Sequence, residues 1–513
     1  MTQRAAAQAA WVPLRATRGF PAGRRRMEGK DPMSLRTPEE YRQALRDSRE
    51  VYMWGERVPD VTTHPALRWA VDTAALDYEM AEHPRLKELA VVQDPDSGQP
   101  MSRYFKIPRT SEDLLKRHEL ILEGTRLGQA TIPFIKDIGT DLIHALLIVT
   151  KKMKDPVYHQ RVLAYREHVK SHDLALAGAW TDVKGDRSLS PRKQSNPDAY
   201  VRVVERRKEG IVVRGAKAHT TAAPYVDELI VVPTRNMREE DQDYALAFAV
   251  PVATKGVKLI VKQAPEVRAR LDAREHNLDF PLPAPRLHLE TLTIFDDVLV
   301  PWDRVFLCGE YPFAGPLAYA CATFHRFTAV SYKPPLGELL AGAAQLIAEA
   351  NGVHQASHIR EKITQIVTYT ETIKALGRAA AHDCQIIEEI AVPHPVITNM
   401  AKYYFASNYH QVVKAVQDIA GGLVVTAPSF KDFQNPATRE LVEKYLGGRA
   451  DISTEQRMRL FQLVRHLTAS DESGVLEVLA VHAEGSIEAQ KMMIYAEAPL
   501  EQYKAFARAV AGI

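Results

Sequence analysis

The chain has 513 residues, of which 46% are hydrophobic and 25% charged, so it is long enough to bury a sizeable core in two or three packed units. Its 66 Lys and Arg residues nearly balance its 64 Asp and Glu residues. This balance gives no strongly basic surface, so we expect no nucleic-acid partner. No apolar run reaches about eighteen residues, so we expect no membrane partner either.

The three cysteines indicate a reducing environment. Cys308, Cys321 and Cys384 are too few and too scattered for a disulfide framework, and none forms a CxxC pair. We therefore expect a cytoplasmic protein.

The first thirty-two residues differ from the rest of the chain. They are rich in Arg and Ala and contain no acidic residue before Glu28. This composition is typical of a transit peptide. The other reading, which we favour, is a start codon assigned too far upstream, with Met33 as the true beginning. We expect residues 1–32 to be a disordered or misassigned extension outside the fold.

Residues 33–178 are predicted to form an N-terminal helical domain. Thr37-Pro38-Glu39-Glu40 has the pattern of a capping box with Pro at the first helical position, and it opens a helix through Arg46. Apolar residues at three- and four-residue spacing predict further helices at 66–82, 111–127, 142–153 and 156–172.

Residues 179–308 are predicted to form a middle β-barrel or sandwich domain, because β-branched residues replace the helical spacing there. Segments 200–205 and 211–217 flank the turn at 207–210 as the arms of a hairpin would. Further short strands are predicted at 228–232, 244–250, 257–261 and 287–295.

Residues 309–513 are predicted to form a C-terminal helical bundle, with long helices at 336–351, 359–376 and 400–420. The Gly421-Gly422 pair ends the last of these helices. The order of helices, strands and helices predicts the α+β class.

The common catalytic motifs are absent from the sequence. No GxGxxG follows a strand, and no GxxxxGK[ST], HExxH, GxSxG or metal-spaced Cys/His set occurs. We therefore expect no Rossmann site for NAD(P)H, no zinc centre and no serine hydrolase site.

Three polar clusters remain as candidates. Residues 181–187 lie at the junction of the helical and strand regions, where clefts between domains bind ligands, although a solvated linker has the same composition. Residues 215–221 end a strand with hydrogen-bonding side chains, which is also common in purely structural strands. His325, with Arg326 and Lys333 nearby, suits a proton carrier or an anion partner, although a lone His is often a core residue. These patterns alone assign no reaction.

Longer stretches carry a resemblance to a known family: 181–189 (TDVKGDRSL), 200–220 (YVRVVERRKEGIVVRGAKAHT), 295–307 (FDDVLVPWDRVFL) and 418–426 (DIAGGLVVT). They resemble the family that contains the oxygenase component of 4-hydroxyphenylacetate 3-hydroxylase and the 4-hydroxybutyryl-CoA dehydratase/vinylacetyl-CoA isomerase. The likeness runs from about Thr37 to the end and is greater to the dehydratase branch.

The resemblance implies an acyl-CoA dehydrogenase-like fold, with FAD between the middle domain and the helical bundle. It also implies a homotetramer or homodimer in which a neighbouring subunit completes the flavin site. By resemblance the residues of the chain's own flavin site are Lys184, Gly185, Asp186, Arg187, His219 and Thr221, and those facing a neighbour's flavin are Asp418, Gly421 and Gly422.

Departures from the two branches shape the predicted reaction. The dehydratase holds a four-iron cluster with three cysteines and one histidine, and only the histidine is matched, by His325. Tyr332 stands at one cysteine position, and 128–141 contains neither of the others, so we expect no iron-sulfur cluster and no metal. The resemblance also gives no counterpart for the dehydratase's glutamate base in 481–486. The substrate-facing histidine of the hydroxylase aligns with Gly178, which leaves the substrate open.

A flavin scaffold with neither a cluster nor an NAD(P)H motif resembles a two-component monooxygenase. We predict that it receives FADH2 from a separate NAD(P)H:flavin reductase and hydroxylates a small aromatic or heteroaromatic substrate through a C4a-hydroperoxyflavin. His325 is expected to act as an acid/base or substrate hydrogen-bond partner. Lys333 is expected to offset the charge of a deprotonated substrate or reduced flavin. The alternatives are a cluster-free flavin dehydratase, isomerase or desaturase acting on a hydroxyacyl- or enoyl-CoA, and a binding protein that has lost its chemistry.

Overall fold

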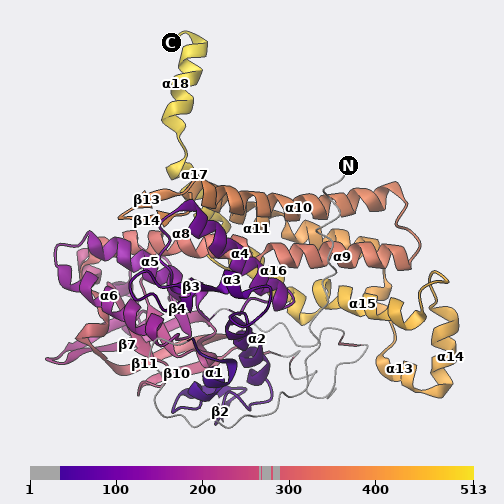
Figure 1. Cartoon of the computed structure of the whole chain (residues 1–513), viewed down its shortest axis with the longest axis horizontal. Coiled ribbons are helices and arrows are strands. Elements are labelled where there is room, and N and C mark those ends of the chain that lie inside the picture. Colours follow the sequence, from indigo (N-terminus) through magenta and orange to yellow (C-terminus); the bar gives the residue numbers. More distant parts are fainter. Residues whose placement is uncertain (1–34, 134, 265–266, 268–278, 281–288) are drawn as a thin grey trace.

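The computed structural model describes residues 35–133, 135–264, 267, 279–280 and 289–513 (Figure 1). The extension expected at 1–32 and the first two residues of the strand expected at 287–295 lie outside the described residues.

The N-terminal part is mainly helical. The capping box predicted at Thr37 is confirmed, since its side chain accepts a hydrogen bond from the Glu40 backbone while the Glu40 carboxylate accepts one from the Thr37 backbone. The helices are α1 (Pro38–Ala44), α2 (Leu67–Glu79), α3 (Lys87–Ala90), α4 (Ser111–Leu127), α5 (Asp137–Lys151) and α6 (Pro156–Ser171). Helix α5 begins at Asp137 rather than at Leu142, because its first turn carries buried polar residues that interrupt the apolar pattern.

Two sheets form the middle of the chain. The six-stranded sheet has the order β2-β1-β10-β11-β7-β6, and the four-stranded sheet has the order β12-β9-β8-β5. Their strands are β1 (Glu50–Met53), β2 (Glu56–Val58), β5 (Leu176–Ala179), β6 (Arg202–Arg206), β7 (Gly210–Thr221), β8 (Glu228–Val231), β9 (Leu246–Pro251), β10 (Val257–Val261), β11 (Glu290–Pro301) and β12 (Val305–Cys308).

The larger sheet recruits a hairpin from the N-terminal part, since β1 pairs with β10 in parallel and with β2 antiparallel. The sequence pattern had placed only helices in that part. Strands of this length are too short for a period of two to stand out. Two further pairs stand apart from these sheets: β3 (Val91–Gln93) with β4 (Pro100–Ser102), and β13 (Gln385–Ile387) with β14 (Ile390–Val392).

The C-terminal part is a helical bundle whose long helices α9, α10 and α11 lie side by side (Figure 1). Its helices are α8 (Ala314–Tyr332), α9 (Pro334–Ala350), α10 (Ser357–His382), α11 (Pro395–Ala420), α12 (Leu423–Thr426), α13 (Phe430–Gln434), α14 (Pro436–Tyr445), α15 (Thr454–Thr468), α16 (Asp471–His482), α17 (Ile487–Glu497) and α18 (Leu500–Ala511). Helix α18 projects from the body of the chain. None of the described helices is long and apolar enough to cross a membrane.

The α+β class and the acyl-CoA dehydrogenase-like order of helices, sheets and helices are confirmed. Two apolar cores underlie this order. One joins the N-terminal helices to both sheets, and the other fills the C-terminal bundle. Helix α8 contributes to both, because Leu317 and Phe324 pack in the first core while Phe327 and Val330 pack in the second. The side chains of α8 therefore lie at the boundary between the two cores.

Candidate functional site

His325 lies on α8 at this boundary, with its side chain 13% exposed. The Trp180 ring meets it edge-on, with ring centroids 5.8 Å apart and an interplanar angle of 65°. The Trp180 indole N–H donates a 3.0 Å hydrogen bond to the Pro233 carbonyl, which fixes the ring. Because Trp180 directly precedes the predicted flavin segment 181–187, the structure brings His325 next to that segment.

A buried ion pair fixes the predicted flavin segment to the end of β7. The Lys217 ammonium lies 2.5 Å from the Asp182 carboxylate and also donates 3.0 Å hydrogen bonds to the Trp180 and Val232 carbonyls. The Ala218 N–H donates to the Thr181 carbonyl at 2.8 Å. The residues predicted to contact flavin, 184–187 and 219–221, therefore lie together at the C-terminal end of β7, which we call the edge of β7.

The backbone at this edge adopts left-handed conformations. Lys184, Gly185 and His219 have φ values of 76°, 54° and 56°. Such a conformation costs about 1–2 kcal/mol at a residue other than Gly, and strain of this kind concentrates at ligand sites. A Cβ on Gly185 would lie 2.3 Å from the Gln194 Oε1 atom, so a larger residue would displace the Gln194 side chain from its hydrogen bond with the Asp186 N–H.

The polar groups of this edge differ in exposure. Asp186 and Arg187 are exposed, and the Asp186 carboxylate accepts hydrogen bonds from the Ser188 N–H and hydroxyl at 2.9 and 2.7 Å. His219 is exposed and Thr221 half-buried. The neighbouring Thr220 hydroxyl is buried without a hydrogen-bond partner in the described part of the chain.

Asp418, Gly421 and Gly422 lie away from this edge within one chain. The Asp418 carboxylate pairs with the Lys362 ammonium at 3.0 Å, and both glycines are exposed. Helices α13 and α14, which follow these glycines, lie at the right of Figure 1, whereas β7 lies at the lower left. A single chain thus separates the two predicted parts of the flavin site.

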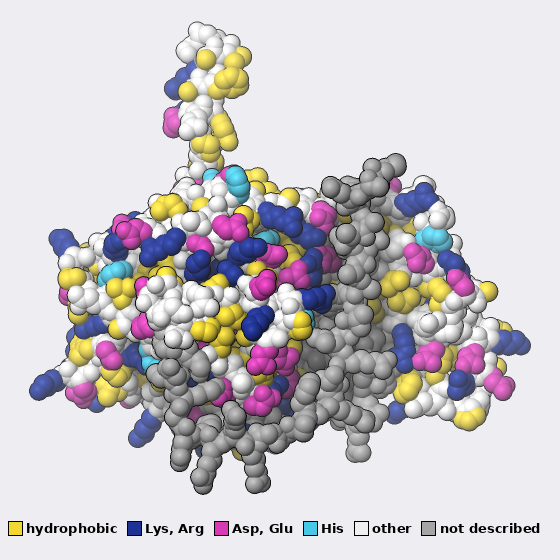
Figure 2. All heavy atoms as spheres, viewed as in Figure 1, with side chains coloured by type: hydrophobic (Ala, Val, Ile, Leu, Met, Phe, Trp, Pro, Cys, Tyr) yellow, Lys and Arg dark blue, Asp and Glu magenta, His cyan; other side chains and the backbone are white. Residues whose placement is uncertain are grey.

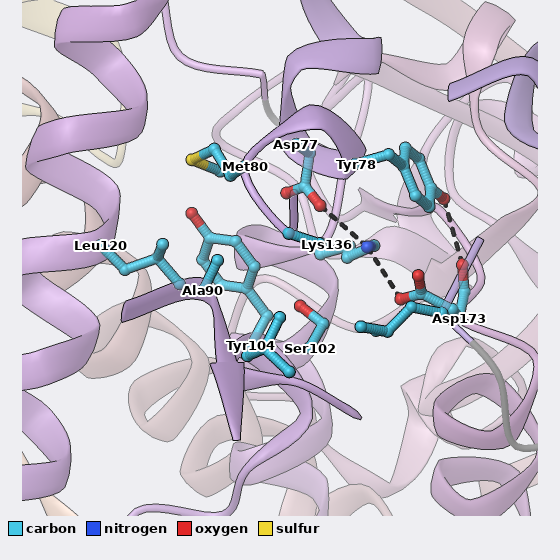
Figure 3. Close-up of a pocket in the computed structure, with 12 residues that line it drawn as sticks. Asp77, Tyr78, Met80, Ala90, Ser102, Tyr104, Leu120, Lys136 and Asp173 are labelled. Atoms are coloured by element: carbon cyan, nitrogen blue, oxygen red, sulfur yellow. Dashed lines mark hydrogen bonds and ion pairs between the residues drawn. The ribbon is translucent and has the colours of Figure 1, made fainter. Parts of the chain in front are cut away.

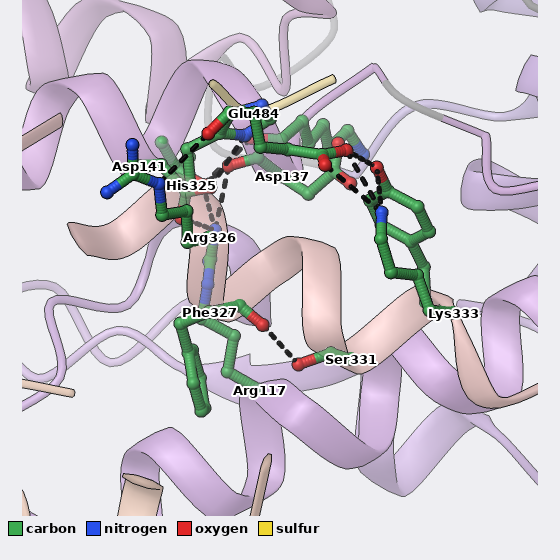
Figure 4. A network of polar contacts seen from close by, with 12 residues as sticks. Arg117, Asp137, Asp141, His325, Arg326, Phe327, Ser331, Lys333 and Glu484 are labelled. Atoms are coloured by element: carbon green, nitrogen blue, oxygen red, sulfur yellow. Dashed lines mark hydrogen bonds and ion pairs between the residues drawn. The ribbon is translucent and has the colours of Figure 1, made fainter. Parts of the chain in front are cut away.

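Lys333 belongs to a buried charge network (Figure 4). Its ammonium lies 3.2 and 3.1 Å from the two carboxylate oxygens of Glu484, and the Lys402 ammonium lies 3.6 Å from one of them. The Tyr332 hydroxyl donates a hydrogen bond to the same carboxylate. The side chains of Lys333, Lys402 and Glu484 are 5%, 0% and 2% exposed.

The charges in this network follow from burial and proximity. Burial alone would raise the pKa of Glu484, but Lys333 and Lys402 outweigh it and lower that pKa to about 2. Burial lowers the pKa of Lys402 to about 8 against the attraction of Glu484, and it also lowers the pKa of Lys333. Burial and Glu484 raise the pKa of the Tyr332 hydroxyl well above its usual value. Glu484 is therefore a carboxylate and Tyr332 a neutral donor at neutral pH.

Arg326 holds the turn that carries Glu484. Glu484 has a left-handed φ of 55°, and Gly485 follows with a φ of 96°. The Arg326 guanidinium donates to the Glu484 carbonyl at 2.9 Å and to the Asn399 side chain at 2.7 Å. A Cβ at residue 485 would lie 2.7 Å from this guanidinium, so only glycine fits there without displacing Arg326.

A second buried cluster lies on the other side of His325. The Arg117 guanidinium lies 2.7 Å from the Asp141 carboxylate and donates to the Asp137 carbonyl at 2.7 Å. The other Asp141 oxygen lies 3.9 Å from the His325 Nδ1 atom. His325 also helps to lower the pKa of Glu484, so it interacts with carboxylates of both buried clusters.

A small cavity elsewhere in the chain is not a ligand site (Figure 3). It has a volume of about 10 Å³, which is room for about one water molecule. Lys136 spans it, with its ammonium 2.8 Å from both the Asp77 and Asp173 carboxylates and 3.9 Å from the centre of the Tyr78 ring. These contacts stabilise the packing of α2 against the start of α5.

Sequence reasoning missed five buried charged residues of the site, Asp137, Asp141, Arg117, Lys402 and Glu484. One signal existed for the first two: Asp137, Asp141 and His144 recur at helical spacing in a run that is otherwise apolar. Polar residues on a buried helix face indicate a functional or paired site. No comparable pattern marks Glu484, which follows α16 in an irregular turn.

Comparison with known proteins gives a consistent result over most of the chain. The profile described as 4-hydroxyphenylacetate 3-hydroxylase N terminal matches residues 37–307, and the corresponding C-terminal profile matches residues 314–512. A 4-hydroxybutyryl-CoA dehydratase/vinylacetyl-CoA-Δ-isomerase of Clostridium aminobutyricum is 32% identical over 93% of this chain and 100% of its own length.

Two solved structures are similar to this chain over most of its length. An oxygen-tolerant archaeal 4-hydroxybutyryl-CoA dehydratase from N. maritimus gives a TM-score of 0.87 at 32% identity and covers 94% of this chain and 95% of its own. The oxygenase component of 4-hydroxyphenylacetate 3-monooxygenase, solved with FAD, gives 0.83 at 28% identity and covers 93% and 98%. Both enzyme types are therefore represented among the relatives.

The Glu484 network predicts the effect of Glu484→Gln. Removing one member of a buried ion pair leaves the other uncompensated, so we expect the free energy of unfolding to fall by about 3–5 kcal/mol at pH 7. Urea denaturation measures this loss, and Glu488→Gln is the matched control because Glu488 makes an exposed pair with Lys491.

The same variant has a predicted pH dependence. The pKa of Glu484 is about 2 in the folded chain against an ordinary 4.5, which corresponds to about 3 kcal/mol. This stabilisation is present above pH 4.5 and is lost as the pH falls towards 2. The difference between wild type and variant should therefore shrink over that range, and a constant difference would contradict the ionised state of Glu484.

Proposed function

Because the chain belongs to the 4-hydroxyphenylacetate 3-hydroxylase family, we propose that it is the oxygenase component of an FADH2-dependent two-component monooxygenase. Its substrate in this proposal is a small aromatic or heteroaromatic compound. The observation that best supports this proposal is the contact between Trp180 and His325, because it joins the predicted flavin segment to the polar groups of α8.

The residues at the edge of β7 fit a flavin. Arg187 and His219 are exposed, and Thr221 beside them adds a hydroxyl, which together suit the anionic and hydrogen-bonding parts of FAD. The buried Thr220 hydroxyl has no partner in the described part of the chain, and the Asp182–Lys217 pair fixes the segment that carries Lys184 and Gly185. The relative solved with FAD supports this assignment.

The donor set around His325 does not fit a four-iron cluster held by three thiolates. Tyr332 and Asp141 lie in this region, together with a single cysteine among the described residues, Cys321, where three thiolates would be needed. Cys321 lies on the same helix, and burial raises its thiol pKa well above the usual value. Cys308 and Cys384 lie on or beside β12 and β13. We therefore include no cluster in the proposed reaction.

The polar groups of α8 have separable roles in the proposed reaction. Reduced flavin bound at the edge of β7 supplies, together with O2, the oxygen atom for the substrate. His325 hydrogen-bonds the substrate and exchanges a proton with it, since its Nδ1 atom is buried without a hydrogen-bond partner in the described part of the chain. Lys333 is paired with the Glu484 carboxylate, which balances its positive charge. We therefore propose that Lys333 orients the Tyr332 hydroxyl more than it offsets the negative charge of a substrate or a reduced flavin.

Two further partners follow from the proposal. A separate NAD(P)H:flavin reductase supplies FADH2, because the sequence has no Rossmann motif and the relative solved with FAD is named an oxygenase component. A second copy of this chain brings Asp418, Gly421 and Gly422 to the flavin, because one chain keeps them far from β7.

The second candidate is a cluster-free dehydratase or isomerase acting on a hydroxyacyl- or enoyl-CoA. The relative from Clostridium aminobutyricum, which is 32% identical and covered over its whole length, favours it. The two candidates differ in whether O2 contributes an atom to the product, which the first experiment measures.

The main prediction concerns oxygen incorporation. Purified protein supplied with FADH2 and ¹⁸O2 is expected to add one ¹⁸O atom to a member of a panel of phenols and N-heteroaromatics, as measured by mass spectrometry. We expect His325→Ala to reduce turnover by about 10²-fold or more with flavin binding retained, because general acid–base groups contribute on this order. His358→Ala is the control, since His358 is exposed on α10.

Other results would contradict this proposal in distinct ways. Flavin reduction by an acyl-CoA without ¹⁸O incorporation would favour the second candidate. Stoichiometric iron and sulfide in anaerobically prepared protein would contradict the proposal that the residues around His325 hold no iron-sulfur cluster. Failure to bind flavin in either redox state would contradict both enzyme proposals and favour a binding protein.

We propose that helix α18 mediates the assembly of copies of this chain. It projects from the body, and Tyr503, Phe506 and Val510 are 60%, 74% and 74% exposed along one face (Figure 2). Exposed apolar faces of this kind mark protein contacts, and we propose that a second copy covers this one. Phe506→Asp with Val510→Asp should therefore lower the molar mass measured by light scattering, whereas Glu501→Gln with Lys504→Gln on the polar face should not. An unchanged assembly in the first variant would place the interface elsewhere.

A further inference from the structure

Asp137 is a buried carboxyl that the roles given above leave unused. It is the first residue of α5 and is 2% exposed. Neither of its carboxylate oxygens has a hydrogen-bond partner in the described part of the chain. Burying an unpaired charged group is costly, so such a carboxyl is expected to bind a proton or a ligand.

The groups that face Asp137 come from several elements. Burial and then Asp141 raise its pKa to about 7, the Ile138 backbone N–H and then Arg117 oppose this rise, and Asp77 adds to it. Asp137 in turn raises the pKa values of the Tyr104 and Tyr332 hydroxyls. The charged and titratable neighbours are therefore Asp77 of α2, Tyr104 before α4, Arg117 of α4, Asp141 of α5 and Tyr332 of α8.

Asp137 lies among the polar groups of the candidate site. In Figure 4 it lies between His325 on one side and Lys333 on the other. The carbonyl of Asp137 accepts the 2.7 Å hydrogen bond from Arg117, which fixes the start of α5, while its carboxyl remains free of that guanidinium. The geometry therefore presents an unpaired carboxyl that is close enough to Tyr332 to raise the pKa of its hydroxyl.

The other carboxyls of the site are less suited to accept a proton. Glu484 is held by Lys333, Lys402 and Tyr332. Asp141 is paired with Arg117 at 2.7 Å. A base works best when its pKa lies near the working pH, which excludes a carboxylate as strongly stabilised as Glu484.

We propose that Asp137 is the proton-accepting residue of the reaction and that the substrate carries an acidic aromatic O–H or ring N–H. This inference rests on the proposed monooxygenase function. The substrate O–H or N–H bond breaks, the proton passes to the Asp137 carboxylate, and the electron pair stays on the substrate. The enriched ring carbon bonds to one oxygen atom of O2 and then loses its own proton to His325, so that Asp137 accepts the first proton of the reaction and His325 the second. The reduced flavin supplies two electrons, and the second oxygen atom leaves as water.

The first test measures whether Asp137 titrates. Asp137→Asn keeps the size of the side chain and removes its ability to ionise. Because the folded-state pKa of Asp137 is raised above its unfolded value, its stabilisation is complete below the unfolded pKa and is lost as the pH rises through about 7. The Tm of the variant should therefore gain on that of wild type between pH 4 and 8. Asp155→Asn at the start of α6 is the control and should show no such gain.

The second test measures the role of that titration in turnover. With FADH2, ¹⁸O2 and a phenol that wild type oxygenates, Asp137→Asn should lose about 10²-fold in kcat, and the acidic limb of the kcat/KM profile near pH 7 should disappear. A variant that keeps this limb, or that shows no pH-linked gain in Tm, overturns the proposal. Absence of oxygenation by wild type itself would instead overturn the proposed function, and this inference with it.

Discussion

Burial of α8 between two apolar cores forces the charged groups of Arg326 and of Lys333, which follows the helix, to find their partners inside the protein. Arg326 and Lys333 are 4% and 5% exposed, so water cannot solvate them. The chain supplies the partners from distant positions: Glu484 lies after α16, and its carbonyl and carboxylate serve Arg326 and Lys333 respectively. To bring Glu484 to these partners, the backbone adopts a strained left-handed conformation at Glu484 and a positive φ at the glycine that follows.

The magnitudes show why these groups define a site as well as a fold. A buried ion pair seldom stabilises a protein more than apolar packing of the same volume would, although breaking it is expensive. Two lysines share the single carboxylate of Glu484, and the pKa of Lys402 falls to about 8 because burial outweighs that attraction. Because these buried charges add so little to the stability of the fold, we infer that they serve to hold a charged or polar ligand. The buried Asp182–Lys217 pair fixes the predicted flavin segment, as the buried Lys333–Glu484 pair fixes the turn after α16.

The sequence predicted the regular elements better than the site. Helix α4 was predicted from its apolar spacing with the bounds that it has, and the structure adds a capping box at Thr110. The start of α5 and the β1–β2 hairpin were missed, the first because polar residues face the site there and the second because three- and four-residue strands show no period. His325 and Lys333 could be selected from the resemblance, but Glu484 and Lys402 could not. Their importance comes from contacts across 151 and 82 residues of sequence, which only the folded chain brings together.

Three carboxyls within one region acquire different properties from their surroundings alone. Two lysines and a tyrosine lower the pKa of Glu484 to about 2, so it serves as a fixed negative charge. Asp141 shares its charge with Arg117 at 2.7 Å and leaves one oxygen towards His325. Asp137 makes no ion pair or side-chain hydrogen bond through its carboxyl in the described part of the chain, so burial outweighs the Ile138 N–H and Arg117 and raises its pKa to about 7. Environments that separate the pKa values of similar groups in this way are how proteins assign one residue to hold charge and another to move protons. The number of partners that each carboxyl has therefore decides its role, and in this region Asp137 is the carboxyl left able to exchange a proton at neutral pH.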